Sequence, residues 1–102
     1  MLAKKFRFKN FNFKNFFKSD KIKADNFLVY RLNYNSQKKF AVWPSKKIFK
    51  KAVERNKIKR QIYEIIKNKI NKIEDGYYLI IPLKKIKFDI LKRELLKIFI
   101  KQ

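Results

Sequence analysis

No cysteine and no histidine occur among the 102 residues of this sequence. Without cysteine there is neither a disulfide framework nor a thiolate nucleophile. Without histidine the commonest general base and metal ligand is missing. The usual zinc sites and the Ser-His and Cys-His dyads therefore cannot be built from this chain. Both absences argue against a self-sufficient enzyme.

Acidic residues are also scarce. The chain has 8 Asp and Glu against 29 Lys and Arg, which gives a formal net charge of +21. Such a charge opposes compaction through self-repulsion and attracts polyanions strongly. The imbalance therefore predicts a nucleic acid as the partner.

Long apolar runs and Gly-rich or Pro-rich linkers are missing as well. No stretch approaches the roughly 18 apolar residues that a membrane-spanning helix needs, so we expect a cytoplasmic protein with no membrane partner. The hydrophobic content of 46% indicates a folded chain. We expect a single domain over residues 1–102. Its first ten residues are predicted to form an extended or mobile basic arm.

The apolar periodicity predicts seven elements. They are a short helix at 12–18, an edge strand at 21–24, strands at 26–32 and 40–43, a long helix at 49–73, a strand at 77–81 and a helix at 88–100. The polar segment 33–37 has the composition of a hairpin loop and predicts that the strands on either side of it pair. This order argues for an α+β sandwich.

Several side chains can be assigned to faces of these elements. In the strand at 26–32, Leu28, Tyr30 and Leu32 alternate with Phe27, Val29 and Arg31. Two apolar stripes are expected to be core: Ile58, Ile62, Ile65, Ile66 and Ile73 in the long helix, and Ile90, Leu91, Leu95, Ile98 and Phe99 in the last one. Trp43 is expected to pack rather than to stack on a ligand.

The segment 50–60 carries the most specific pattern. Lys51, Arg55 and Lys59 follow one another at intervals of four residues, and Asn56 and Arg60 form a second such pair. Like charges at that spacing destabilise a helix slightly, so the pattern predicts an anionic partner, most simply a phosphate backbone. We expect the first two turns to project past the sheet and to leave Arg55 free for a ligand. The alternative is a solvated helix face.

The residues at 55–60, read as Arg-Asn-x-x-Lys-Arg, resemble the RNR signature of the bacterial ribonuclease P protein subunit. Segments 27–32 and 78–81 are similar to that family's second and last strands, and segment 39–48 is similar to its third strand and the run into the long helix. The resemblance implies a four-stranded sheet with a left-handed crossover through the long helix, a fold shared with the second domain of a ribosomal protein. It also implies a set of contacts to the catalytic RNA: Lys51, Arg55, Asn56, Lys57, Lys59 and Arg60.

A second surface is implied by the same resemblance. Family members place aromatic residues comparable to Phe13, Phe17 and Tyr30 in a cleft that holds the single-stranded 5′ leader of precursor tRNA. Aromatic faces accept unpaired bases, and nearby cations hold the backbone. The cations expected to do so are Lys9, Lys14, Lys18 and Arg31. Ordinary core packing is the alternative for these rings, and it is the interpretation that we favour for Phe16.

The resemblance implies endonucleolytic removal of the 5′ leader from precursor tRNA. The catalytic RNA and its Mg²⁺ ions carry out the chemistry, so this chain has no catalytic residue and no direct metal ligand. The implied partners are that RNA and precursor tRNA, with one protein per RNA and higher order possible. One departure is expected to alter the start of the long helix: Phe49 and Lys50 stand where the family usually has glycine, in a segment one residue longer.

Three other functions fit parts of the pattern. A ribosomal protein that binds ribosomal RNA structurally is the nearest alternative, since composition cannot separate the two. A basic protein that binds anionic lipid would expose apolar residues opposite its cations. A metal-independent nuclease using lysine and tyrosine would cleave RNA without an added RNA subunit.

Overall fold

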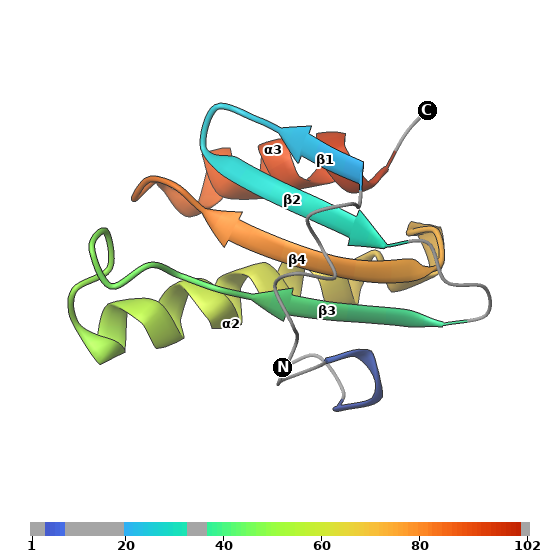
Figure 1. The fold of residues 1–102 in the computed structure, drawn as a ribbon, viewed down its shortest axis with the longest axis horizontal. Helices are drawn as coiled ribbons and strands as arrows, with labels where there is room; N and C mark the ends of the chain where they lie inside the picture. The colour runs from blue at the N-terminus through green and yellow to red at the C-terminus, as the bar shows by residue number, and fades with distance from the viewer. Residues whose placement is uncertain (1–3, 8–19, 33–36, 101–102) are drawn as a thin grey trace.

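One four-stranded sheet forms the centre of the molecule. The computed structural model describes residues 4–7, 20–32 and 37–100. The strands are β1 (Asp20–Lys23), β2 (Phe27–Leu32), β3 (Lys38–Val42) and β4 (Gly76–Pro82), and they lie side by side in the order β1-β2-β4-β3. Figure 1 shows this order from β1 to β3 across the sheet.

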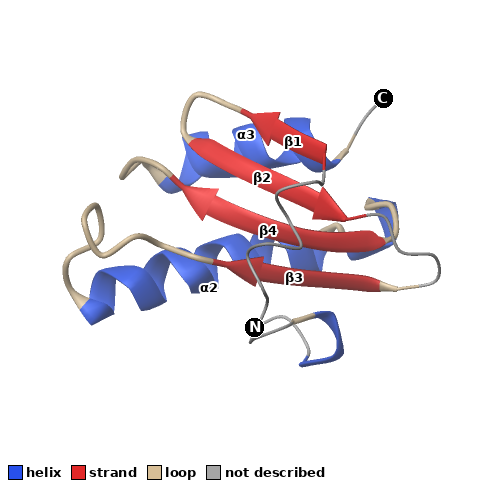
Figure 2. Ribbon diagram, in the orientation of Figure 1, coloured by secondary structure: helices blue, strands red, loops and turns tan. Residues whose placement is uncertain are grey.

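The helices cover one face of the sheet. They are α2 (Ala52–Asn68) and α3 (Phe88–Phe99). The chain also forms two short 3₁₀ helices, η1 (Lys4–Phe6) and η2 (Ile70–Lys72). Both long helices lie behind the strands in Figure 2. Their arrangement confirms the predicted α+β sandwich. The predicted helix at 12–18 lies outside the described residues.

The predicted pairing of the strands around residues 33–37 is wrong. β2 pairs with β4 in antiparallel register, with Leu28 opposite Ile81, whereas β3 pairs with β4 in parallel register, with Ala41 opposite Leu79. β4 is buried along nearly its whole length. A strand that is apolar on both faces gains most from the centre of a sheet, so β4 lies between the strands that precede it in sequence.

The connection from β3 through α2 to β4 is left-handed. In Figure 2 both strands point to the left, β4 lies above β3, and α2 runs behind the sheet. The chain runs to the left along β3, returns to the right behind the sheet through α2, and then runs to the left again along β4, which lies above β3 (Figure 2). This turn of the chain is left-handed. The general rule for parallel strands predicts the opposite hand, so the expectation taken from family resemblance is confirmed.

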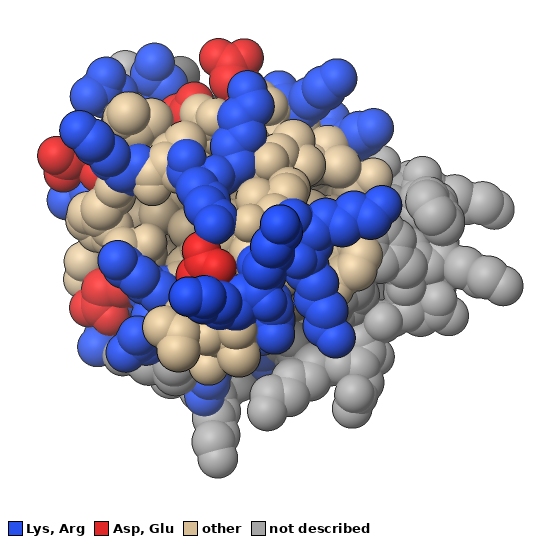
Figure 3. All heavy atoms as spheres, turned by 90° about the vertical axis from the view of Figure 1, so that its left-hand side faces the viewer, with Lys and Arg blue, Asp and Glu red and all other residues tan. Residues whose placement is uncertain are grey.

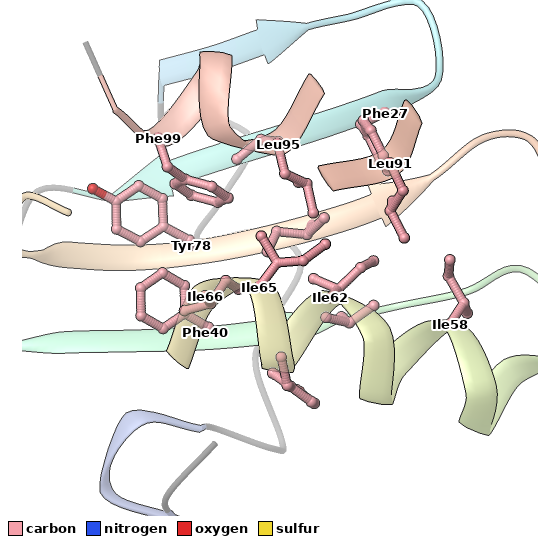
Figure 4. Close-up of a cluster of buried hydrophobic side chains, with 14 of the residues drawn as sticks. Phe27, Phe40, Ile58, Ile62, Ile65, Ile66, Tyr78, Leu91, Leu95 and Phe99 are labelled. Carbon is pink, nitrogen blue, oxygen red and sulfur yellow. The ribbon is translucent and has the colours of Figure 1, made fainter. Parts of the chain in front are cut away.

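The main core lies between the helices and the sheet. All five isoleucines of the predicted stripe through residues 58–73 are buried. α3 adds Leu91, Leu95 and Phe99, as Figure 4 shows. Ile98 is only partly buried, and Ile90 is 40% exposed, so the prediction that Ile90 is core is wrong.

Three aromatic rings pack against one another at one end of this core. The rings of Phe40 and Tyr78 stack with their centroids 5.1 Å apart, and Phe99 meets Tyr78 edge-on at 5.2 Å. The Tyr78 hydroxyl still reaches a partner, because it donates to the Glu74 carbonyl at 2.9 Å. Burial raises the pKa of that hydroxyl. The cluster joins β3, β4 and α3.

The long helix is shorter than predicted. It begins at Ala52 rather than Phe49, and beyond Asn68 the chain continues as η2. Residues 45–49 form a turn in which the N–H groups of Ile48 and Phe49 donate to the Ser45 carbonyl. Phe49 is 4% exposed and belongs to the core. Residues 49–51, which were predicted to be helical, therefore precede the helix.

The opposite face of the sheet carries a second apolar cluster. Ala41, Leu79 and Ile81 are buried there, with the predicted set of Leu28, Tyr30 and Leu32 packed against them. The predicted alternation in β2 is therefore confirmed. At the outer edge of β3, residues 4–7 of the predicted arm form η1 and a parallel bridge from Arg7 to Phe40. The rest of that arm lies outside the described residues.

Candidate nucleic-acid interface

The start of α2 gathers most of the predicted cations. In Figure 1 the first turns of α2 extend beyond the ends of β3 and β4, as expected. Figure 3 views this end and shows Lys and Arg crowded over it with few acids between them. Lys51, Asn56, Lys57 and Arg60 are exposed, and Lys59 is half-buried.

Arg55 is not free, which corrects the prediction. Its Nη1 donates to the carbonyl oxygens of Phe49 at 2.8 Å and of Lys50 at 3.0 Å. These carbonyls lie in the segment that precedes the helix, so the guanidinium braces the turn against the first turn of α2. A hydrogen-bond donor of fixed fork geometry suits two neighbouring carbonyls. The side chain holds the helix start in place.

Glu54 lies among these cations and has two partners. Its carboxylate accepts the Lys51 backbone N–H at 3.2 Å and forms an ion pair with Lys85 Nζ at 2.5 Å. The hydrogen bond from Lys85, followed by that from Lys51, holds the pKa of this carboxyl below its ordinary value. The pair ties the loop after β4 to the start of α2, and it partly neutralises the surface at that point.

The six predicted RNA contacts do not form one row. Arg55 and Lys59 border a hollow shared with Trp43, Lys46 and Lys47. Lys57 borders a different hollow, shared with Phe88 at the start of α3 and with Lys85. Asn56 and Arg60 face solvent between the two. The structure thus spreads the motif around the end of the helix.

The predicted leader cleft is described only in part. Phe13 and Phe17 lie outside the described residues, as do Lys9, Lys14, Lys18 and Phe16. Tyr30 lies on the sheet face that the helices do not cover, opposite Leu79 in register. Its other register partner is Lys21 of β1, which is exposed. Residues directly opposite in adjacent strands share a face, so a cation stands beside Tyr30.

Arg31 does not belong to that face. It pairs with Glu74 at 2.9 Å, donates to the Asp75 carbonyl at 3.2 Å and lies 5.6 Å from the centre of the Tyr78 ring. These contacts place it on the helix side, against the segment before β4. The expectation that Arg31 helps to hold a leader is therefore wrong.

Two features of the surface were missed from the sequence. The sequence predicts only that Lys21 lies in an edge strand, and the register shows that it is the partner of Tyr30. Trp43 was expected to pack, yet it is 48% exposed. Pro44 directly after it was the one available signal, since it ends the strand and leaves the tryptophan at the rim of the sheet.

Within residues 4–7, 20–32 and 37–100, no group of three or more acidic, histidine or cysteine side chains is arranged to hold a metal ion. None of the described helices is long and apolar enough to cross a bilayer.

The fold and this surface define a small, strongly basic α+β protein of the kind that binds nucleic acids. The family model for ribonuclease P matches residues 2–102, and the chain belongs to that family as a protein component of ribonuclease P. No curated protein sequence matches it.

Solved structures agree with this assignment. A ribonuclease P protein of Staphylococcus aureus, described as a mutant with defective mRNA degradation activity, is 29% identical with a TM-score of 0.80, covering 91% of this chain and 86% of that chain. Another structure of the S. aureus ribonuclease P protein is 26% identical and has a TM-score of 0.75. The match covers 100% of this chain and 97% of that chain. The ribonuclease P protein of Thermotoga maritima shares the fold, with 23% identity and a TM-score of 0.77. The match covers 86% of this chain and 88% of that chain.

Proposed function

We propose that this protein binds the catalytic RNA of ribonuclease P through the start of α2 and the 5′ leader of precursor tRNA through the Tyr30 face of the sheet. In doing so it assists the endonucleolytic, metal-dependent removal of the leader. The observation that carries the proposal is the exposed cationic end of α2, which displays the Arg-Asn-x-x-Lys-Arg motif in a member of this family.

The RNA surface consists of the exposed motif residues. Lys51, Lys57 and Arg60 have their side chains in solvent and can neutralise phosphates, while Asn56 can donate to phosphate or sugar oxygens. Lys59 contributes from the rim of a hollow. Arg55 acts indirectly, because its hydrogen bonds fix the turn from which these side chains project.

The leader surface joins an aromatic ring to a cation. Tyr30 offers a ring that can stack on an unpaired base, and Lys21 beside it can meet the following phosphate. Phe13 and Phe17 complete this surface in the proposal. We assign Mg²⁺ to the RNA rather than to the protein, as the family resemblance implies. One protein would bind one RNA.

The test is cleavage of precursor tRNA by the cognate catalytic RNA at low Mg²⁺, with and without the protein. Substrates with a long leader and with a one-nucleotide leader are compared. We expect strong stimulation that favours the long leader. Stimulation without leader dependence would remove the leader surface. Tight, salt-sensitive RNA binding without stimulation would instead favour a structural RNA binder, as in a ribosomal protein.

Matched variants locate the two surfaces. Arg60→Ala should lose stimulation with both substrates, whereas Arg93→Ala removes an exposed cation of α3 and serves as its control. Tyr30→Leu should lose only the preference for the long leader, and Tyr30→Phe, which keeps the ring, should retain it. Equal losses for Arg60→Ala and Arg93→Ala would contradict a localised contact at α2.

A further inference from the structure

A hollow lies between the end of β3 and the start of α2. Trp43 forms one of its walls, and its backbone N–H still donates to the Ile80 carbonyl at 2.9 Å, so the residue is fixed to the sheet. Arg55 and Lys59 come from α2, and Lys46 and Lys47 come from the turn between the two elements. The volume is about 430 Å³, within the range of roughly 300–1,000 Å³ found for small-molecule pockets.

We propose that Trp43 is a stacking platform for an unpaired nucleotide of RNA, whose phosphates are held by Lys46, Lys47 and Lys59. The inference rests on the proposed function, because it assumes an RNA partner, and it adds a contact outside the motif at 55–60.

The indole is placed for such a contact. It is the largest aromatic side chain, and 48% of the residue is exposed, whereas most large apolar residues here are buried. A base can stack on an indole whatever its identity, since every base has a flat π-face. The backbone hydrogen bond to Ile80 fixes the point at which the ring is attached, so only the side-chain torsions have to be ordered when a base arrives.

The charges around the ring suit a phosphate. Four of the seven residues that line the hollow are Lys or Arg, and none is acidic. Arg55 Nη1 already donates to two carbonyl oxygens, so we assign the phosphate to the lysines, whose ammonium groups form no hydrogen bond within the part of the chain that the structure describes. Lys46 and Lys47 are exposed and can move to it. By contrast, the hollow beside Phe88 contains Glu54, whose carboxylate would repel a phosphate there.

The sequence makes the test direct, because Trp43 is the only tryptophan. Its fluorescence reports on this hollow and nowhere else. The full-length protein is titrated with a short single-stranded RNA, with the catalytic RNA alone, and with precursor tRNA carrying a long or a one-nucleotide leader. We expect quenching by the short RNA. Quenching by the catalytic RNA alone would identify it as the source of the nucleotide, whereas quenching that needs the long leader would identify the leader.

Variants separate stacking from general structure. Trp43→Leu should weaken binding of that RNA about tenfold, which corresponds to one lost base stack, whereas Trp43→Phe should retain most of the affinity. Phe88→Leu removes another exposed aromatic, 39% exposed at the start of α3, and should bind like the wild type. Matching thermal unfolding of the four proteins confirms that the comparison concerns binding.

The failure of this inference differs from the failure of the proposed function. If the wild type stimulates cleavage but its fluorescence is unchanged and Trp43→Leu binds normally, the stacking role is overturned and the subunit role stands. If Trp43→Leu and Phe88→Leu weaken binding equally, the stacking role is likewise overturned. If the wild type neither binds RNA nor stimulates cleavage, the proposed function fails and the inference fails with it.

Discussion

Arg55 shows how a residue of the motif proposed to bind RNA can instead bond to the protein's own backbone. Its guanidinium donates to two carbonyls of the segment before α2, and this segment also holds the buried Phe49 ring. Without these bonds the two carbonyls would depend on water, and the turn would lose its link to the helix. The motif therefore combines a residue that fixes the surface with residues that lie in solvent.

Arg55→Ala should lower the free energy of unfolding by about 1–2 kcal/mol, since it removes two hydrogen bonds from a charged donor in a partly exposed place. Urea unfolding measures the change. Arg60→Ala is the matched control, because Arg60 is an exposed arginine of the same helix, and its effect should stay within about 0.5 kcal/mol. Equal stability of the two variants would mean that the Arg55 hydrogen bonds contribute nothing.

Glu54 makes stability depend on pH. Its pKa is lower in the folded protein than the ordinary value of 4.5, because Lys85 and the Lys51 N–H favour the charged carboxylate. The folded state therefore releases this proton more readily than the unfolded state does. The stabilising contribution is fully present above the ordinary pKa and disappears as the pH falls through the folded pKa.

Glu54→Gln should therefore be less stable than the wild type at neutral pH, and the difference should vanish in acid. Urea unfolding from pH 7 to pH 3 measures this. Lys85→Gln should also reduce the difference between neutral and acid stability, whereas Lys84→Gln, which changes the neighbouring exposed lysine, should keep the wild-type profile. A constant gap between Glu54→Gln and wild type at every pH would contradict the ionic origin of the effect.

At the scale of elements, β4 depends on its first residue. Gly76 is the only glycine of the chain and has a φ of +151°, a conformation that side chains rarely adopt. A Cβ at this position would lie 3.0 Å from the Leu32 carbonyl oxygen. The Gly76 N–H also donates to the Gln37 carbonyl at 2.7 Å. The residue thus allows the chain to turn into the centre of the sheet.

Gly76→Ala should destabilise the protein by about 1–3 kcal/mol, because alanine is strained at this φ and meets the backbone of β2. Thermal or urea unfolding gives the value. Asn71→Ala changes an exposed residue of the preceding η2 and should have little effect. A Gly76→Ala protein as stable as the wild type would show that the β4 start relaxes without cost.

The elements follow from local patterns, but their pairing does not. Isoleucines at helical spacing predict α2 and its buried face, and the alternation of side chains along β2 predicts which of them share a face. A polar segment at 33–37 suggested that β2 and β3 pair, yet β4 separates them. The apolar run at 77–81 favours the centre of a sheet, but which strands become its neighbours depends on the rest of the fold and cannot be seen within a short window.

The sequence predicts which residues form the candidate site, but not how their side chains are arranged. The spacing at 51–60 placed the cations on α2, but only the structure shows that Arg55 bonds to Phe49 and Lys50. Lys21 lies beside Tyr30 because of the strand register, and Trp43 and Lys59 line one hollow because a turn brings the end of β3 near α2. Such contacts join parts of the chain that no local pattern relates.

For the whole molecule, the uneven charge has a thermodynamic consequence. A protein of net charge +21 that neutralises phosphates releases counterions, so its affinity for RNA falls steeply with salt. Removing one phosphate contact should lower the slope of log affinity against log salt by roughly 0.7–0.9. Only cations that touch the RNA should show this, whereas distant ones act weakly through the overall field.

Arg60→Ala should therefore reduce the salt slope for the catalytic RNA by roughly 0.7–0.9, and Arg93→Ala on α3 should leave it almost unchanged. Arg55→Ala should change the slope less than Arg60→Ala does, because the Arg55 guanidinium is occupied by backbone carbonyls. Binding measured from low to moderate salt with each variant gives the slopes. Equal reductions for all three arginines would mean that the RNA senses diffuse charge, and the start of α2 would then have no special role.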